Sequence, residues 1–503
     1  MRELPKGWAI GPLVNFITPR GEKVLPSAFP KLPFIGMDHV EAHTTRILGS
    51  IPAGKLKSSA VRFYTKDILY GRLRPYLNKV AQPNFDGLAS AEFIIFSGNK
   101  LIDPAFLRYR LNARDFVSFA ISLNAGDRPR VNFDQISDFE ILVPPLNEQR
   151  RIVAKIEAMF DQIDKGVESL KTARATLGLY RQSLLKAAFE GRLTAEWRAQ
   201  NAEKLEDADT LLSRIKAERE ARYKAALKDW AEDVARWRAD GQKGKRPVKP
   251  KRPNTSNALQ HRQIELPELP YGWAWAPLGL CSLGPEYGTA AKSKDTGKVP
   301  VIRMGNLQRG RINWGKLAFT SDPNEIEQYM LKPGDVLFNR TNSPELVGKT
   351  SIYKGERPAL FAGYLVRVNQ IEEIVSGDYL NYFLNSTFAS QHSTTVKTDG
   401  VNQSNINASK LQQYPFPFCS PAEQVEIVRL LDARLDAADT LEAEIDAALT
   451  RAETLRQSIL KKAFAGRLVP QDPNDEPASV LMQRIHAEQT KPPKTLRKTR
   501  RSA

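Results

Sequence analysis

The chain has 503 residues, of which 41% are hydrophobic, and it carries a formal net charge of +17 at pH 7. One hydrophobic core does not organise a chain of this length, so at least two domains are expected. The positive charge indicates a polyanionic partner, such as nucleic acid or a membrane surface. No run of 18 apolar residues and no signal-peptide pattern occurs, which excludes membrane-spanning and secreted classes and predicts a cytoplasmic protein.

Residues 1–145 are expected to form a first mixed α/β domain. Short apolar runs such as residues 93–96 are typical of strands and are separated by Gly, Pro and Asn, whereas residues 106–111 look helical. This pattern gives the class of the domain but not the order of its strands.

Residues 146–195 are expected to form a long helix. Proline is absent from Leu146 to Arg246, and apolar residues recur at alternating steps of three and four, which is typical of a coiled-coil seam. The seam residues of this helix are Val153, Ile156, Phe160, Ile163, Val167 and Leu170.

Residues 196–262 are expected to form a charged helical connector that ends in a basic linker. Between Lys243 and Arg252, lysine and arginine alternate with Pro and Gly, without an acidic residue. Such a run is either simply solvated or adds non-specific attraction to phosphates.

The remainder of the chain repeats the first half. Residues 263–420 are expected to form a second α/β domain, because the opening Leu-Pro-x-Gly-Trp of residues 4–8 returns at residues 269–273. Residues 421–468 are expected to form a second long helix. Residues 469–503 should form a shorter helical segment with its own basic tail.

The two long helices are the best-preserved part of the repeat. Arg-Gln-Ser-Leu-Leu-Lys at residues 181–186 returns as Arg-Gln-Ser-Ile-Leu-Lys at residues 456–461, an offset of 275. Glu442 interrupts the second seam. The seam residues of the second helix are Val428, Leu431, Leu435, Ile445, Leu449 and Ile459.

Two such stripes are most simply buried against each other, as an antiparallel coiled coil with a pseudo-two-fold axis. About 45 residues at about 1.5 Å each give a rod on the order of 65 Å long. The alternative, in which each helix packs on its own domain or on another protein, is also compatible with the pattern.

The sequence carries no recognisable catalytic site. Gly348-Lys349-Thr350 resembles the end of a phosphate-binding loop, but Ser343 occupies the place of the required glycine. His39 and His43 are not in the His-Glu-x-x-His order, and Cys281 and Cys419 have no metal-ligand spacing, so neither a metal site nor a disulfide is expected. Any DNA chemistry must belong to another chain.

Two variable heads, each followed by Glu-Gln and a long helix ending in Arg-Gln-Ser-Leu/Ile-Leu-Lys-x-Ala-Phe-x-Gly-Arg-Leu, resemble the specificity subunit of type I restriction-modification systems. The resemblance covers nearly the whole chain, and residues 67–75 and 334–342 also look like target-recognition motifs of that family. The charged insertion between about residue 194 and residue 262 departs from the family pattern.

The resemblance implies that each head reads one half of a bipartite, asymmetric double-stranded DNA target, and that the coiled coil sets the spacing. Side chains that reach base edges are required, chiefly Arg to guanine and Asn or Gln to adenine. Arg72 and Arg340 are at matched positions and equally suit a phosphate clamp. The candidates are Arg72, Arg74, Arg128 and Arg130 in the first head, and Arg340, Asn342, Asn402, Gln403 and Asn405 in the second.

The resemblance also implies partners. Two methyltransferase subunits would bind the repeated helices, with two optional motor-nuclease restriction subunits. S-adenosylmethionine, ATP and Mg²⁺ would be used by those partners, and this chain would hold no cofactor. Two rival classes are a DNA-modifying enzyme, which the missing motifs disfavour, and a coiled-coil scaffold that binds only proteins.

Overall fold

The computed structural model describes residues 4–98, 100–123, 126–250, 252, 256, 258–259, 265–401 and 403–489, with the side chains of residues 485–489 excepted. The chain forms two compact units. The first contains Met1–Thr172 and Ile445–Ala503, and the second contains Ala173–Glu444. Each unit therefore combines one head with a part of both long helices.

The two long helices are α4 (Leu146–Phe189) and α11 (Pro421–Ala463). Both end in the same way. Gly191 and Gly466 follow the helices with φ angles of +72° and +69°, and the next amide bonds back to the fifth preceding carbonyl, Arg192 to Ala187 at 2.9 Å in the first case. This is the Schellman ending, in which glycine adopts the left-handed conformation without steric cost.

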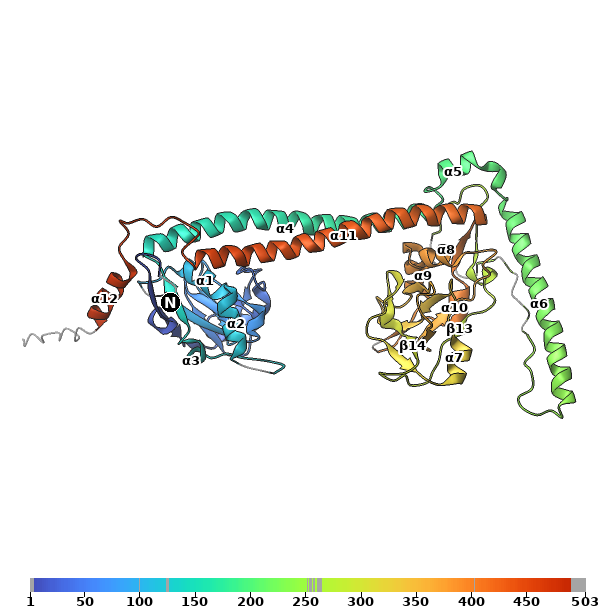
Figure 1. Cartoon of the computed structure of the whole chain (residues 1–503), viewed down its shortest axis with the longest axis horizontal. Helices are drawn as coiled ribbons and strands as arrows, with labels where there is room; N and C mark the ends of the chain where they lie inside the picture. Colours follow the sequence, from blue (N-terminus) through green and yellow to red (C-terminus); the bar gives the residue numbers. More distant parts are fainter. Residues whose placement is uncertain are drawn as a thin grey trace, which may run out of the picture. The chain divides into compact units, whose positions relative to one another are not determined.

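Within each unit the two helices lie side by side (Figure 1). In the first unit, the start of α4 and the end of α11 share one core through Ile156, Phe160, Ile459 and Leu460. In the second unit, the end of α4 packs beside the start of α11. Helix starts are thus paired with helix ends, as the predicted antiparallel arrangement requires.

The first head is built from short strands in three sheets. Their orders are β1-β11, β2-β10-β7-β8 and β3-β6-β9-β4-β5. The helices α1 (Pro104–Asn112), α2 (Arg114–Ser122) and α3 (Phe133–Ile136) accompany them, and α12 (Ala478–Gln489) belongs to the same unit. The strands are β1 (Ala9–Pro12), β2 (Ile17–Arg20), β3 (Lys23–Val24), β4 (Pro33–Ile35), β5 (Ile51–Pro52), β6 (Ala60–Phe63), β7 (Ile68–Gly71), β8 (Val80–Ala81), β9 (Gly87–Ser90), β10 (Phe93–Gly98) and β11 (Glu140–Val143).

The second head has four sheets, in the orders β12-β25, β13-β22-β18-β20-β16-β15, β17-β14-β21 and β19-β24-β23. Its strands are β12 (Ala274–Pro277), β13 (Glu286–Tyr287), β14 (Val299–Ile302), β15 (Leu307–Gln308), β16 (Gly310–Ile312), β17 (Ala318–Thr320), β18 (Val336–Asn339), β19 (Thr341–Asn342), β20 (Thr350–Ile352), β21 (Leu360–Phe361), β22 (Leu365–Arg367), β23 (Thr398–Asp399), β24 (Ser404–Asn405) and β25 (Pro415–Phe418). Its unit also holds the helices α5 (Ala195–Gln200), α6 (Ala208–Ala239), α7 (Pro323–Tyr329), α8 (Gly377–Leu384), α9 (Thr387–Val396) and α10 (Ala408–Gln412).

The first and last strands of each head pair in the same register. Ala9 faces Val143 in the first head, and Ala274 faces Phe418 in the second. This pair of strands brings the two ends of each head together at the start of a long helix. The repeat detected in the sequence is therefore a repeat of structure, and the fold is the predicted one of two mixed α/β domains joined by paired helices.

Candidate nucleic-acid interface

Strand β7 of the first head leads into a segment that carries two of the predicted DNA-binding residues. The amide of Arg74 donates to the carbonyl of Pro129 at 2.8 Å, and the amide of Val131 donates to the carbonyl of Arg72 at 3.1 Å. Leu73 forms an antiparallel bridge with Arg130. All four candidates of this head, Arg72, Arg74, Arg128 and Arg130, thus lie on two adjacent antiparallel segments.

The second head builds the same element from β19 and β24. Thr341 pairs with Asn405 in the antiparallel ladder, and the amide of Ile406 donates to the carbonyl of Arg340 at 2.9 Å. The described candidates of this head, Arg340, Asn342, Gln403 and Asn405, are again on two adjacent segments. We call this pair of segments the ladder element of each head.

The two ladder elements match residue by residue. An offset of 268 relates their first segments and an offset of 275 relates their second segments, so the Leu73–Arg130 bridge corresponds to the Thr341–Asn405 pair. Four arginines in the first head therefore correspond to one arginine and three amide side chains in the second. The equivalent pairs are Arg72 and Arg340, Arg74 and Asn342, Arg128 and Gln403, and Arg130 and Asn405.

The side chains of the first ladder element are held by neighbours of the same head. Arg72 donates to the side-chain oxygen of Asn132, and Arg130 donates to Glu92 at 2.5 Å. Arg128 is exposed. Arg74 adopts a left-handed backbone with φ of +52°. Arg130 of this element is thus paired with a carboxylate, and Arg72 with a neutral amide.

The second ladder element is held differently. The guanidinium carbon of Arg340 lies 4.8 Å from the ring centroid of Tyr287, and the Asn405 amide donates to the hydroxyl of Thr341 at 2.8 Å. Asn342 accepts from the amide of Ser343 at 2.9 Å. Sequence reasoning missed Tyr287, because nothing in the chain near Arg340 signals an aromatic ring 53 residues earlier.

The tip between β23 and β24 is the most exposed part of this element. Gln403 is exposed, Val401 is fully exposed, and the amide of Gly400 donates to the carbonyl of Gln403 at 2.7 Å. Asn402, the remaining candidate, lies outside the described residues.

The shared Asp-Ile/Val-Leu-Tyr/Phe motif has a structural role at its first residue. Asp67 accepts from the amide of Tyr64 at 2.9 Å and from Arg20 at 2.8 Å. The equivalent Asp335 accepts from the amide of Lys332 at 2.9 Å. Each aspartate closes the turn before the strand that leads to the ladder element.

The Gly-Trp and Glu-Gln motifs of each repeat contact each other. The indole of Trp8 donates to Glu148 at 3.1 Å, and the indole of Trp273 donates to Glu423 at 2.8 Å. Burial raises the pKa of Glu148, and the bond from Trp8 opposes this rise. These motifs fix the start of each helix to the opening of its own head.

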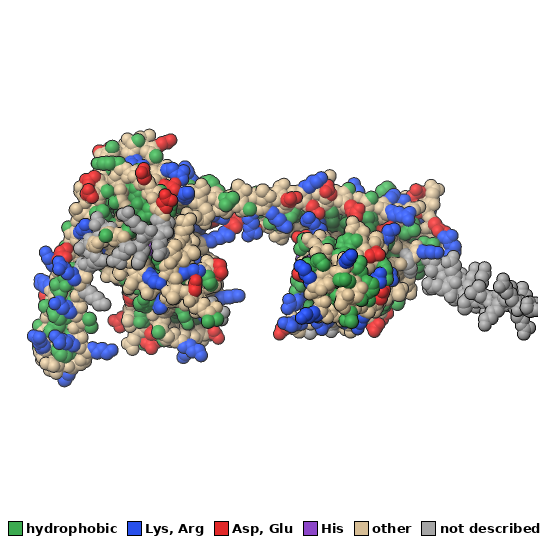
Figure 2. Space-filling model, turned by 180° about the vertical axis from the view of Figure 1, so that it is seen from behind, with side chains coloured by type: hydrophobic (Ala, Val, Ile, Leu, Met, Phe, Trp, Pro, Cys, Tyr) green, Lys and Arg blue, Asp and Glu red, His purple; other side chains and the backbone are tan. Residues whose placement is uncertain are grey.

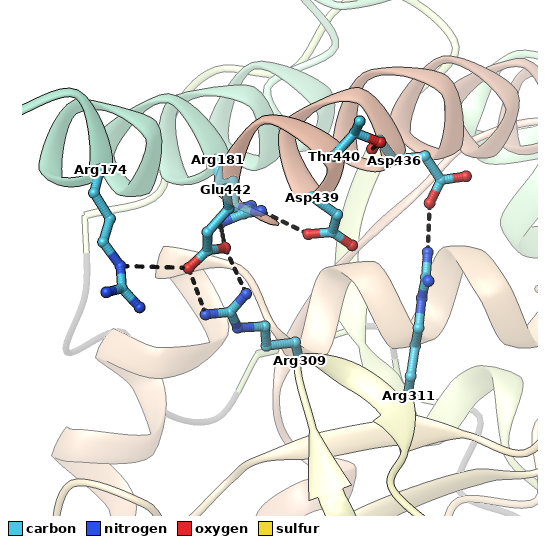
Figure 3. Close-up of polar contacts among 8 residues, drawn as sticks. All are labelled: Arg174, Arg181, Arg309, Arg311, Asp436, Asp439, Thr440 and Glu442. Atoms are coloured by element: carbon cyan, nitrogen blue, oxygen red, sulfur yellow. Dashed lines mark hydrogen bonds and ion pairs between the residues drawn. The ribbon is translucent and has the colours of Figure 1, made fainter. Parts of the chain in front are cut away.

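A charged cluster joins α4, α11 and the second head (Figure 3). Arg181 on α4 donates to Asp439 at 2.6 Å and to Glu442 at 2.7 Å. Arg309, before β16, donates to both oxygens of Glu442 at 2.6 and 2.9 Å, and Arg311 donates to Asp436 at 2.5 Å. Arg309 and Arg181 hold the pKa of Glu442 at about 2. The residue that interrupts the second seam is thus the acceptor of an ion cluster.

The other seam residues face inward. Val153, Ile156, Phe160, Leu431, Ile445 and Ile459 are buried. The remaining six, Ile163, Val167, Leu170, Val428, Leu435 and Leu449, are half-buried.

Among the described residues, no group of three His, Cys, Asp or Glu side chains is placed to hold a metal ion. Cys281 and Cys419 are buried, and burial raises the pKa of the Cys281 thiol to about 12. The described helices include none long and apolar enough to cross a membrane.

Comparison with known proteins gives the family. The sequence model of the type I restriction modification DNA specificity domain matches residues 33–171 and 282–451. The chain belongs to this family.

Individual relatives agree. The specificity subunit of the type I restriction enzyme EcoKI from Escherichia coli is 23% identical over 97% of this chain and 96% of its own length. That of EcoDI, also from Escherichia coli, is 35% identical over 39% of this chain and 45% of its own length. A solved chain from a study of complex assembly in the type I R-M system has a TM-score of 0.63 at 19% identity, covering 93% of this chain and all of that one. This likeness supports the fold.

Proposed function

We propose that this chain is the non-catalytic DNA-recognition subunit of a type I restriction-modification complex, and that each head reads one half of a bipartite, asymmetric target. The observation that carries the proposal is the pair of ladder elements. They share one backbone register, yet they differ at three of four side-chain positions. A common frame with different side chains is what two different half-sites require.

The side-chain chemistry of the two ladder elements indicates which bases each head prefers. Bidentate arginine recognises the N7 and O6 acceptors of guanine, and Asn or Gln recognises the acceptor and donor of adenine, with each good pair worth about 1–3 kcal/mol of discrimination. We infer that arginines such as Arg128 favour guanine contacts in the first half-site. Gln403 and Asn405 favour adenine contacts in the second.

The long helices supply the spacing in this proposal. A helix of 44 residues such as α4 is about 66 Å long at about 1.5 Å per residue. The start of each long helix pairs with the end of the other, so each helix can join both heads. In this proposal, helix length therefore sets the distance and rotation between the two half-sites that are read. A continuous target would not need such a device.

Methyl transfer and cleavage belong to partner chains in this proposal. Tyr180 and Leu455 are equivalent in the repeat and are 44% and 50% exposed on the two helices. Two equivalent apolar positions suit two copies of one methyltransferase subunit, with two restriction subunits as optional members. The methyltransferase would flip an adenine and use S-adenosylmethionine, and a restriction subunit would use ATP and Mg²⁺.

Selection from a random duplex library by this chain, in complex with its methyltransferase subunit, tests the proposal. We expect a target with two short specified parts separated by unspecified base pairs, and no methyl transfer by this chain alone. Gln403→Ala should relax one position in the second part only. Arg128→Ala is the matched variant for the first part. Selection of one continuous site, or methylation by the isolated chain, would overturn the proposal, and absence of any selected sequence would favour a protein-binding scaffold.

A further inference from the structure

Helix α6 is firmly anchored to the second head at its beginning. Leu211, Leu212 and Ile215 are buried in the core of that unit. Arg219 donates to the carbonyl of Gly279 at 2.6 Å and to that of Leu280 at 3.0 Å. The first part of the helix is therefore fixed, and its continuation projects beside the head (Figure 1).

The chain then returns along the same helix. The indole of Trp230 donates to the carbonyl of Pro247 at 3.1 Å, and the indole of Trp237 donates to that of Gly244 at 3.3 Å. The ammonium group of Lys249 lies 5.7 Å from the ring centroid of Trp230, in cation–π range. We call residues 223–250, which comprise the end of α6 and this returning segment, the basic arm.

The returning segment is strongly basic and open to solvent. Lys243, Lys245, Arg246 and Lys249 are all exposed, and Asp240 is the only acidic residue in the stretch 240–250. The helix beneath does not neutralise them, because residues 223–239 contain four Lys or Arg against three Asp or Glu. Lys and Arg side chains accordingly lie along the projecting helix and its return (Figure 2).

The repeat separates the arm from the anchoring part of α6. Arg214 pairs with Glu206 at 3.0 Å, and at an offset of 270 Arg484 pairs with Glu476 in the first unit. The equivalent helix α12 is described from Ala478 to Gln489, and Gln489 corresponds to Arg219. The part of α6 that the described residues of both units share is thus its anchoring part.

We propose that the basic arm binds the phosphate backbone of duplex DNA adjoining the half-site read by the second head. This inference rests on the proposed function. Double-stranded DNA carries about one negative charge per 1.7 Å of its axis, and each neutralised phosphate steepens the salt dependence of binding by about 0.9. Two tryptophan bonds hold the four cations on a helix that is fixed to the head, so little ordering is required on binding.

The test uses the complex with the methyltransferase subunit and the quadruple variant K243Q/K245Q/R246Q/K249Q. The dissociation constant is measured against salt on the selected target with long flanks and with the flank next to the second half-site removed. We expect the variant to lower the magnitude of the salt slope by about 2 to 4 on the long duplex. On the truncated duplex, variant and wild type should agree.

The charge-preserving variant K243R/K245R/K249R is the matched control and should keep the wild-type slope. An unchanged slope in the glutamine variant overturns the role of the arm. So does a weaker complex with the methyltransferase subunit, which would assign the arm to a protein contact. In either case, the proposed function stands if the wild-type complex still selects a bipartite DNA target. If the wild-type complex selects no sequence, the proposed function is refuted instead.

Discussion

Arg181 and its repeat equivalent Arg456 make the same contact in the two units. Arg181 donates to Asp439 on the facing helix, and Arg456 pairs with Asp164, the residue equivalent to Asp439. Such reciprocity is the mark of a two-fold interface, in which one patch meets its own copy. A single chain therefore contains, once in each unit, the contact that a symmetric dimer of helices would make twice.

The symmetry is broken next to this contact. Glu442 stands where the first repeat has Val167, and it accepts from Arg181 and Arg309. Its pKa of about 2 lies below the ordinary value of 4.5. A carboxylate whose pKa is lowered on folding stabilises the folded state at pH values above its unfolded-state pKa. That stabilisation is lost as the pH falls from about 4.5 toward 2.

We therefore expect Glu442→Gln to destabilise the second unit at neutral pH. The loss of unfolding free energy should lie between two limits. An exposed ion pair contributes ~0–1 kcal/mol and breaking a buried ion pair costs ~3–5 kcal/mol, and here Glu442 is nearly buried while Arg309 is largely exposed. Denaturant midpoints of both proteins across pH 7 to 3 measure it. The difference must shrink below about pH 4.5. A difference that is constant with pH would contradict the ionic role.

The helix endings give a second prediction. A Cβ at Gly191 would approach the Cγ of Pro270 to 2.5 Å, and one at Gly466 would approach that of Pro5 to 2.7 Å. Alanine at either position must also adopt a left-handed backbone, which costs about 1–2 kcal/mol. We expect Gly191→Ala and Gly466→Ala each to lower the thermal midpoint.

Gly178 provides the control. It lies within α4, and a Cβ there would meet nothing within 4 Å. Gly178→Ala should raise stability by up to about 1 kcal/mol, since alanine is the better helix former. Destabilisation by all three substitutions would contradict this explanation, because Gly178→Ala meets no neighbouring atom and should gain helix propensity.

The two tryptophans that open the heads should differ in importance. Glu423 accepts from Thr194 at 2.7 Å and from Arg198 at 2.6 Å, in addition to Trp273. For Glu148, the bond from Trp8 counters the burial that raises its pKa. Removing the donor from a buried acceptor costs about 1–3 kcal/mol when no other partner replaces it.

Trp8→Phe should therefore destabilise its unit more than Trp273→Phe destabilises the other. Amide hydrogen exchange resolves the two units separately, because it reports local opening. Equal losses of protection in the two variants would show that ring volume, and not the indole bond, is what matters.

The sequence predicted the architecture because the repeat preserves contacts that depend on residue identity. Trp8 needs Glu148, and Gly191 needs a left-handed turn, so both survive at their offsets in the second copy. The pairing of the helices followed from apolar periodicity, and its antiparallel direction followed from each helix leaving its own head. The periodicity also marked Glu442 as an exception without giving its partners. Arg309 is 133 residues away, and no local pattern connects the two.

The candidate site was predicted only in part. Matching Arg72 with Arg340 located the first segment of each ladder element, but the second segment lies beyond a stretch of different length in each head. Only the backbone register shows that Arg130 corresponds to Asn405. Strand order and the ring of Tyr287 beneath Arg340 are equally long-range features, and hydrophobic pattern carries no information about them.

An experiment on Arg340 can distinguish a phosphate contact from recognition of a base. Its guanidinium rests on Tyr287 and its backbone is bonded within the ladder element, which holds the cation at a fixed place, as a phosphate clamp requires. Arg340→Ala should weaken binding to all sequences alike and lower the magnitude of the salt slope by about one. Gln403→Ala, which removes no charge, should leave the slope unchanged and relax one base. Were Arg340→Ala to keep the full slope while relaxing a single base position, Arg340 would be a reader of sequence, and the matched Arg72 should then be tested in the same way in the first half-site.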